Sequence, residues 1–282
     1  VGYSALFFFG VSLITLAKLQ LATVFIFFMF AFLKFLNDKR FSFFSISLSD
    51  IKEEFKELTP LGRKNLLTTI SNAIMTNGPI LIISSYLGAN SAAIVGAAKT
   101  ISNIPRQIMS AMHTSSIPEF SSYFAQNKQS TLIFLFKRIF KLTIGINFLA
   151  TMLIIFSGNF ILLNLLLIEY ENAHILFLFF SIWCLSEGMK MIIHDSLLGM
   201  NEYGKIGLIN IVGSCIMIMV IYALIPFLSI YALPASLALI NICWGIPALI
   251  FVFTKHFQGL GMTSWILKNS SPVFICIIFL IY

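Results

Sequence analysis

The sequence predicts an all-α fold, a polytopic bundle of about nine transmembrane helices. Of its 282 residues, 59% are hydrophobic and 10% are charged, and its mean hydropathy is +0.95. Soluble proteins have roughly 45–50% apolar and about 25% charged residues. Apolar runs of about 17 to 25 residues, long enough to cross a bilayer, recur along the whole chain. These observations leave no room for a separate soluble domain.

The predicted spans are the apolar runs taken in order. They are residues 2–17, 19–36, 64–86, 91–112, 142–167, 173–197, 206–228, 232–254 and 264–282. The chain begins at Val1 rather than at a methionine, and its first run lacks the basic lead and cleavage site of a signal peptide. The odd number of spans agrees with this beginning. We therefore expect the chain to be part of a longer protein, with a C-terminus that is either cut or ends in the membrane.

Basic residues mark one side of the predicted membrane. Alternate connections carry Lys39, Arg40, Lys52, Lys56, Arg63, Lys64, Lys128, Lys137, Arg138, Lys141, Lys205, Lys255 and Lys268. The opposite loops, "SYLGAN", "IEYEN" and "LSIY", carry none. Because Lys and Arg in short loops stay on the cytoplasmic side, this side is predicted to be cytoplasmic. The formal charge of +7 thus indicates topology and contact with anionic membrane lipids, and it does not call for nucleic acid.

The longest connection, residues 37–63, is the best candidate for a boundary between structural halves. Its apolar residues Leu48, Ile51, Phe55 and Leu58 share one helical face, which predicts a short helix on the cytoplasmic surface. Pro60 and Gly62 are expected to end this helix. A solvated charged linker is the alternative, because the period covers only two turns.

A second amphipathic stretch precedes the span 142–167. It places Leu132, Leu135, Phe136 and Ile139 beside Lys137, Arg138 and Lys141. We expect this stretch to lie at the membrane surface and to lead into the span.

The stretch "AAKTISNIPRQIMSAMHTSS" carries an unusual stripe of charge. The stripe consists of Lys99, Arg106 and His113, which recur every seven residues and share one helical face with Asn103. Counted from the outer end of the helix, Lys99 lies about 12 Å deep, Arg106 about 22 Å and His113 about 33 Å. A charge at the centre of the membrane costs roughly 2.5–3.5 kcal/mol and normally faces a protein interior or a water-filled cavity. Lys99, Asn103 and Arg106 are therefore candidate substrate-binding residues, with a structural ion pair as the alternative. Pro105 is expected to bend the helix, and His113 to be a solvated histidine near the cytoplasmic surface.

Glu187 and Lys190 form the second charged group inside a predicted span. Their i, i+3 spacing lets them neutralise each other along one helix. A structural pair and a role in ion coupling or substrate contact remain equally open. In the span 64–86, Asn72 and Asn77 are further candidate substrate-binding residues. We expect Asn77, Gly78 and Pro79 to interrupt that helix and free backbone groups for a ligand. Hydrogen bonding between helices is the alternative reading.

Few features of the sequence indicate a disulfide, a metal site or catalysis. The four cysteines stand singly in four apolar runs, at Cys184, Cys215, Cys243 and Cys276, so we expect no disulfide and no metal site. The sequence has no paired-carboxylate motif, nucleophile elbow, phosphate-binding loop or HExxH motif. We therefore expect neither a cofactor nor an enzyme.

The central part of the chain resembles a known family. The residues that carry the resemblance are Gly62 and Arg63 at the basic entry, "SYLGAN" leading into "AAKTISN", and "SIPEFS" after it, with "LLNLLLIEYENAHILFLFFSIWCLSEG" and "LLGMNEYGKIGLINIVG" further along. Over about residues 60 to 250 they resemble polysaccharide flippases of the O-antigen type, within the multidrug/oligosaccharidyl-lipid/polysaccharide exporter superfamily.

This resemblance implies two six-helix lobes around a central cavity. Residues 1–36 would be the last helices of the first lobe, 37–63 the linker, 64–254 the second lobe and 255–282 an additional helix. The implied activity is transfer of an undecaprenyl-diphosphate-linked oligosaccharide, an O-antigen or capsule repeat unit, to the outer leaflet of the bacterial inner membrane. Lys99 and Arg106 would offset the charge of its diphosphate. Because most of the first lobe is missing, this chain alone is not expected to alternate access.

Several alternatives remain open at this point. The first is export of a drug or another solute, which a cationic track would suit poorly if the solute were a cation. The second is a membrane-embedded polysaccharide polymerase, which the lack of a large outer loop disfavours. The third is a non-functional remnant of a flippase gene. Polysaccharide assembly proteins are possible partners of any active form.

Overall fold

The computed structural model describes residues 21–22, 25–30, 48–166, 171–257 and 261–281, and the statements below concern these residues. Every regular element among them is a helix, which confirms the predicted all-α class. The chain divides into two compact units, residues 1–59 and 60–282. In the first unit, residues 21–22, 25–30 and 48–59 are helical. The predicted span 2–17 lies outside the described residues, as do most of the span 19–36 and the first part of the linker.

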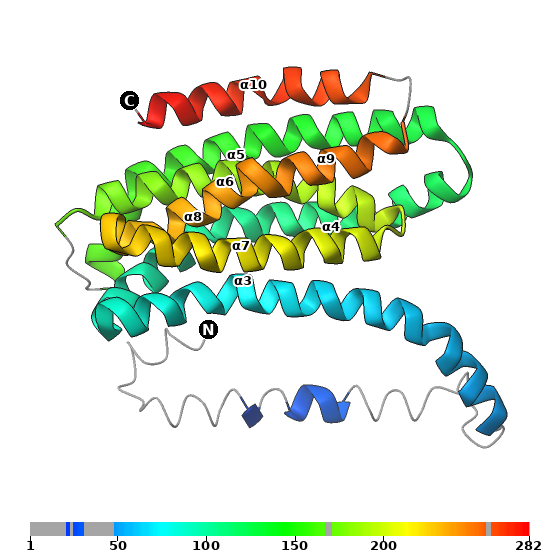
Figure 1. The fold of residues 1–282 in the computed structure, drawn as a ribbon. Coiled ribbons are helices and arrows are strands. Elements are labelled where there is room, and N and C mark those ends of the chain that lie inside the picture. The colour runs from blue at the N-terminus through cyan, green and yellow to red at the C-terminus, as the bar shows by residue number, and fades with distance from the viewer. Residues whose placement is uncertain (1–20, 23–24, 31–47, 167–170, 258–260, 282) are drawn as a thin grey trace. The chain divides into compact units, whose positions relative to one another are not determined.

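Figure 1 shows the described helices in the order of the chain. They are α3 (Leu48–Ser102), α4 (Ile104–Ala125), α5 (Gln129–Leu166), α6 (Ala173–Gly199), α7 (Tyr203–Leu228), the 3₁₀ turn η2 (Ser229–Tyr231), α8 (Ala232–Ile240), the π-helical turn η3 (Asn241–Gly245), α9 (Ile246–Lys255) and α10 (Met262–Ile281).

Four described stretches are long and apolar enough to cross a membrane. They are Leu66–Ser102, Gln129–Asn164, Ala173–Gly199 and Tyr203–Lys255. The last one reverses direction at Ser229, where φ is 50° and ψ is −124°, so that α8 packs back against α7. Helix α4 is not among the four, because its many polar residues lower its hydropathy. About nine spans are therefore not confirmed.

Helix α3 contains the turn that was predicted in "SYLGAN". Gly88 has φ 86° and ψ 169°, a backbone conformation that only glycine adopts readily, and it is the one non-helical residue inside α3. The Nζ atom of Lys99, after the turn, donates to the carbonyl oxygen of Thr76, before it, at 2.7 Å. Because Thr76 and Lys99 are almost equally far from Gly88 in sequence, the two arms of α3 run alongside each other.

Two predicted interruptions of α3 are wrong. The helix continues through Pro60 and Gly62, and again through Asn77, Gly78 and Pro79. A proline removes one backbone donor and bends a helix, but the turns on both sides of it can still form. The chain breaks instead at Asn103, between α3 and α4, where Pro105 follows within the first turn of α4. The predicted span 91–112 is thus divided between two helices.

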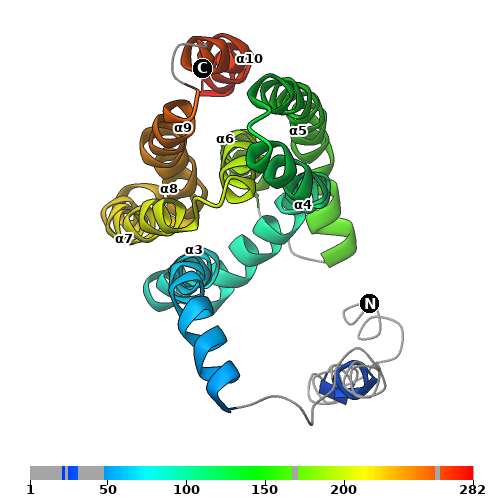
Figure 2. The same ribbon diagram turned by 90° about the vertical axis from the view of Figure 1, so that its right-hand side faces the viewer.

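Helix α6 lies at the centre of the second unit. It packs against α4, α5, α7, α8, η3, α9 and α10, and Figure 2 shows it between the α4–α5 pair and the α7–α9 group. Both aromatic and small residues of α6 are buried, including Phe177, Phe180, Trp183 and Gly188. Helix α3 meets α7 through the Tyr86 and Tyr222 rings, whose centroids are 5.5 Å apart.

The start of α5 differs from the predicted surface segment. Leu132, Phe136 and Ile139 are buried in the core, and they belong to a continuous helix of 38 residues. That length corresponds to about 57 Å, well beyond a hydrocarbon core of about 30 Å. The helix is therefore longer than the hydrocarbon core is thick, and its first turns pack against other parts of the protein.

Large apolar side chains cover much of the outer surface. Phe156 and Phe227 are 81% and 84% exposed, and Leu81 and Leu208 are also exposed. An outer surface of this kind requires an apolar solvent, which is what lipid provides. The chain is therefore a membrane protein.

Candidate functional site

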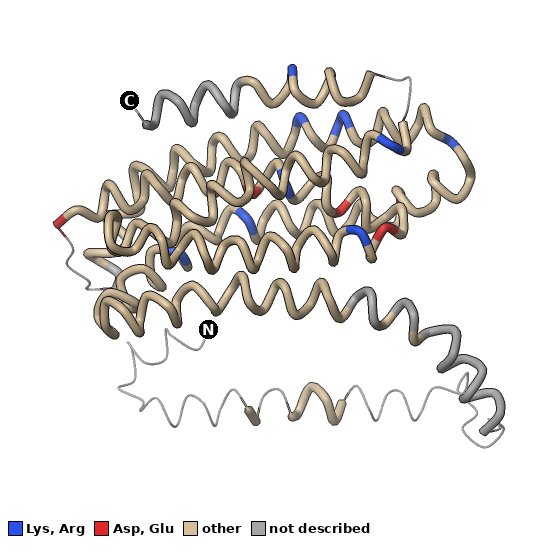
Figure 3. The backbone as a smooth tube through the Cα atoms, in the orientation of Figure 1, with Lys and Arg blue, Asp and Glu red and all other residues tan. Residues whose placement is uncertain are grey.

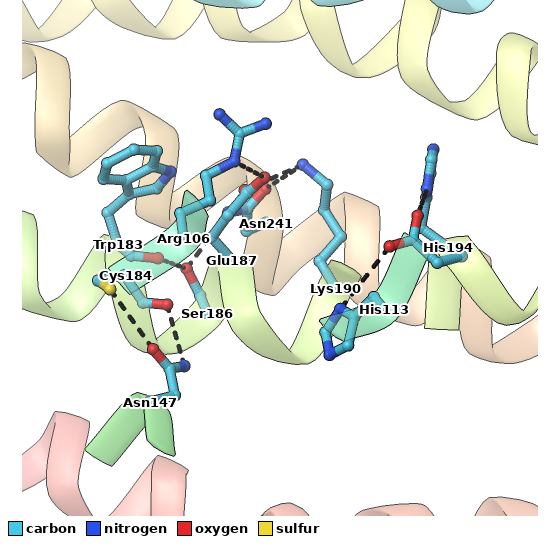
Figure 4. Close-up of polar contacts among 11 residues, drawn as sticks. Arg106, His113, Asn147, Trp183, Cys184, Ser186, Glu187, Lys190, His194 and Asn241 are labelled. Atoms are coloured by element: carbon cyan, nitrogen blue, oxygen red, sulfur yellow. Dashed lines mark hydrogen bonds and ion pairs between the residues drawn. The ribbon is translucent and has the colours of Figure 1, made fainter. Parts of the chain in front are cut away.

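Five polar side chains meet inside the second unit, and we call them the polar cluster. They are Lys99 at the end of α3, Arg106 in α4, Glu187 and Lys190 in α6, and Asn241 in η3. Figure 4 shows Glu187 between Arg106 and Lys190, with Asn241 beside it. In Figure 3, charged positions lie within the bundle as well as at its right-hand end, where the α4–α5, α6–α7 and α9–α10 connections are found.

Glu187 is the centre of the polar cluster. Its Oε1 atom lies 3.5 Å from Nε of Arg106, and its Oε2 atom accepts hydrogen bonds from Nζ of Lys190 at 3.1 Å and from Nδ2 of Asn241 at 2.7 Å. The Glu187 side chain is only 9% exposed. A carboxylate buried to this extent is stable only with charged and hydrogen-bonding partners, and here it has three.

The π-helical turn brings Asn241 into the polar cluster. Its side chain donates to Glu187 and also accepts a hydrogen bond from Nζ of Lys190 at 3.0 Å. Gly245, at the end of the turn, lets the Lys190 side chain pass close, because a Cβ atom there would lie 3.2 Å from Cδ of Lys190. Single π turns inside α-helices occur frequently at functional sites.

Arg106 turns only part of its guanidinium toward Glu187. Its Nε atom makes the charge contact at 3.5 Å but has no hydrogen-bond partner among the described residues. Its side chain is 41% exposed, and Figure 4 shows the two terminal nitrogens directed away from Glu187. Arg106 can therefore hold Glu187 and still present free N–H donors to a ligand.

Two cavities adjoin the polar cluster. One of about 50 Å³ is lined by Lys99, Asn103, Arg106, Glu187 and Lys190, together with Asn72, Thr76, Trp183 and Asn241. The other, of about 200 Å³, is also lined by Arg106, Glu187 and Lys190 and extends toward His194 and Asp195. Arg106 is therefore both an ion-pair partner of Glu187 and a cavity-lining residue.

The polar cluster carries an excess of positive charge. Lys99, Arg106 and Lys190 contribute three positive charges and Glu187 contributes one negative charge, which leaves a formal +2 when all four are ionised. Lys99 is 6% exposed and donates to the Thr76 carbonyl oxygen. Such an arrangement can bind an anion, because cations in a medium of low dielectric constant attract it strongly.

The structure brings most of the sequence-predicted residues together. Lys99, Asn103, Arg106 and Asn72 line the smaller cavity with Glu187 and Lys190. Asn77 does not belong to this group; it is exposed and does not line either cavity. Asn241 was missed, because a lone asparagine in an apolar run gives no sign of the π turn that directs it inward.

His113 is not the solvated histidine that was predicted. Its side chain is fully buried, with Nε2 2.7 Å from Oγ1 of Thr143 and Nδ1 3.7 Å from Oδ2 of Asp195. The depth estimate placed its Cα near the membrane surface, but the packing of α5 and α6 against α4 covers the ring. His113 therefore belongs to the protein interior.

Within the described part of the chain, the cysteines form no second functional site. Cys184 is a buried free thiol that donates to Oδ1 of Asn147 at 3.4 Å, and Cys215 and Cys243 are exposed free thiols. Cys276 lies among residues whose side chains are not described. Within the described part of the chain, no group of three or more His, Cys, Asp or Glu residues could hold a metal ion.

Comparison with known proteins gives one family. A family model described as "Polysaccharide biosynthesis protein" matches residues 3–174, which is more than half of the chain. No curated protein and no solved structure matches. The matched range includes Lys99, Asn103 and Arg106 and ends at the beginning of α6.

Proposed function

This chain belongs to the polysaccharide biosynthesis protein family and is of the flippase type, and we propose that it moves an undecaprenyl-diphosphate-linked oligosaccharide across the bacterial inner membrane. The oligosaccharide is a repeat unit of O-antigen or capsule, and transfer runs from the cytoplasmic to the outer leaflet. We place the chain as a multi-pass protein with its basic connections in the cytoplasm, because Lys and Arg gather there.

One observation carries the proposal: a cavity inside the helical unit has an excess of positive charge. The substrate class has an anionic diphosphate between a lipid chain and a neutral or acidic sugar. Arg106 has free N–H donors at the cavity, and Lys99 lies on its wall. Arginine binds phosphate oxygens through two parallel hydrogen bonds, whereas lysine acts as a point charge. Together they can offset the diphosphate where water is scarce.

Glu187 gives the site a second property. It keeps the cations in place and reduces their net charge, since Arg106 and Lys190 both contact its carboxylate. A diphosphate bound by the terminal nitrogens of Arg106 shares that guanidinium with Glu187. Because Glu187 already offsets part of the positive charge, the anion is held less tightly than by unpaired cations, and its binding is reversible, as a transporter requires.

The test uses cells whose surface polysaccharide depends on the gene that encodes this chain. Lys99→Ala and Arg106→Ala are compared with Lys128→Ala, which removes an exposed cation from the α4–α5 connection. Loss of a hydrogen bond to a charged group costs about 1.5–3 kcal/mol. We expect surface polysaccharide to fall at least about tenfold in the first two variants, with unchanged protein abundance and with lipid-linked repeat units retained in the inner leaflet.

Other outcomes identify other functions. Normal surface polysaccharide in both Lys99→Ala and Arg106→Ala, at normal abundance, would contradict the proposal. Single repeat units at the surface without long chains would indicate a polymerase, and altered resistance to drugs would indicate export of another solute.

A further inference from the structure

A second group of ionisable side chains lies two turns beyond Arg106 along α4, and no part of the function proposed above uses it. His113 comes from α4, Thr143 from α5, and His194 and Asp195 from α6. His113 is completely buried, whereas His194 and Asp195 reach the larger cavity. Figure 4 shows Lys190 between this group and Glu187.

We assign the proton of a neutral His113 to one ring nitrogen from the hydrogen bonds of Thr143. The Thr143 hydroxyl donates its single proton to the carbonyl oxygen of Ile139 at 2.8 Å. Its oxygen can therefore only accept from Nε2 of His113, which lies 2.7 Å away. A neutral His113 thus holds its proton on Nε2 and has a bare lone pair on Nδ1.

That lone pair faces a negative charge. Nδ1 of His113 has no hydrogen-bond partner within the described part of the chain, and Oδ2 of Asp195 lies 3.7 Å from it. The other oxygen of Asp195 lies 2.8 Å from Nδ1 of His194, which must donate because an ionised carboxylate only accepts. A lone pair opposite a carboxylate oxygen in a buried place is unfavourable.

We propose that His113 and Asp195 form a proton-binding site, in which one proton is shared between Nδ1 of His113 and Oδ2 of Asp195. This proton completes the hydrogen bonding of both atoms and cancels the negative charge of the partly buried Asp195. It reaches the site through the cavity side, where the His194 side chain is 17% exposed and Asp195 is 13% exposed. His194 stays bonded to the other oxygen of Asp195 throughout.

The groups that face His113 come from α5 and α6. From α5, His113 meets the uncharged hydroxyl of Thr143, and from α6 it meets Asp195, with His194 next to it. Lys190 and Arg106 lie further along α6 and α4 and contact Glu187. The site for the proton and the site for the anion are therefore made of different side chains, but α4 and α6 contribute to both.

The shared proton links two helices, α4 and α6. A movement that separates these helices therefore breaks the shared hydrogen bond and weakens the hold of both groups on the proton. For transport, this step rests on the proposed function: opening between α4 and α6 would exchange a proton for each conformational cycle. Arg106 and Glu187 form a parallel contact between the same helices that does not depend on a proton.

The test is a titration that needs no substrate. The purified full chain in lipid nanodiscs, with ¹⁵N-histidine and ¹³C-aspartate labels, is studied by NMR between about pH 5 and pH 8. The four histidines are assigned by single substitution to glutamine. We expect His113 to be protonated on Nε2 throughout and to gain a proton at Nδ1, or Asp195 to gain one at its carboxyl group, in a single shared step. No change at either group, or a neutral His113 protonated on Nδ1, would overturn the proposal.

Two variants test the partner atoms. Asp195→Asn is expected to remove the step, and Thr143→Val is expected to abolish the preference of the proton for Nε2. An unchanged titration in Asp195→Asn would contradict the shared site. If Asp195→Asn does not fold, the titration of the unmodified chain still decides.

The link to transport has its own control. His113→Gln should lower surface polysaccharide at least about tenfold at normal abundance, while His256→Gln, which changes a histidine paired with Glu202 near the α6–α7 connection, should stay within about twofold. Normal export in His113→Gln would exclude the proton from the transport cycle. Failure of the proposed function is recognised by a different result, namely normal export of surface polysaccharide in Lys99→Ala and Arg106→Ala.

Discussion

The Nε atom of Arg106 in α4 lies 3.5 Å from the Oε1 atom of Glu187 in α6. This contact joins two charged groups that lie 81 positions apart in the chain and that were predicted separately. It also explains how two helices of a membrane protein tolerate such costly residues, since each charge faces the other across the interior. The predictions below test what this contact and its surroundings contribute.

Replacement of Glu187 tests the centre of the polar cluster. Glu187→Gln leaves Arg106 and Lys190 without their common anion, and breaking a buried ion pair from one side costs about 3–5 kcal/mol. We expect a marked fall in the midpoint of thermal unfolding of the purified protein. Glu202→Gln is the matched control, because its partner Lys205 is 55% exposed and such surface pairs contribute about 0–1 kcal/mol. Equal stability of the two variants would contradict a structural role for Glu187.

Asn241 tests the contribution of the π turn. Asn241→Ala removes the donor to Glu187 and the acceptor for Lys190. Unsatisfied buried groups cost about 1–3 kcal/mol, so we expect lower stability and a reduced export of surface polysaccharide. The control is Asn269→Ala, since the Asn269 side chain donates within its own helix, α10, to the carbonyl oxygen of Trp265. If both variants behave alike, Asn241 has no special part in the site.

Gly188 tests the close contact between α5 and α6. A Cβ atom at this position would overlap the side-chain amide of Asn147, which donates to the carbonyl oxygens of Cys184 and Leu185. We expect Gly188→Ala to destabilise the protein by about 1–3 kcal/mol, measured as a lower unfolding midpoint. Gly145→Ala, with no atom within 4 Å of its added Cβ, should be neutral. A neutral Gly188→Ala would show that Asn147 can move without cost.

Gly88 tests the turn of α3. Its φ of 86° and ψ of 169° fall in a region that only glycine occupies readily, so alanine there costs about 1–3 kcal/mol. We expect Gly88→Ala to lower both abundance and thermal stability, because the turn positions Lys99 next to Thr76. Gly96→Ala, inside a helix with free space around it, should not destabilise. Abundance and the unfolding midpoint are measured for both variants, and equal values for Gly88→Ala and Gly96→Ala would contradict the role of Gly88 in the turn.

Much of the fold could be predicted from the sequence, because helix formation in a membrane is a local property. The apolar runs predicted helices α6, α7 and α10 nearly to their ends, and the predicted loop "SYLGAN" contains the turn of α3. Helix breaks were predicted less well. Pro60, Gly78 and Pro79 stay inside a helix, whereas Asn241 begins a π turn, since the backbone at these positions depends on the neighbouring helices.

The sequence by itself determined which residues of this protein are costly in a membrane, namely Lys99, Arg106, Glu187 and Lys190, because the free energy of placing a charge in lipid depends only on residue type and depth. Only the tertiary structure decided how they are combined. It set Glu187 between Arg106 and Lys190, added Asn241, left Asn77 outside and buried His113 against Asp195. Those outcomes depend on which helix faces meet, and helix packing is fixed by contacts between residues far apart in the chain.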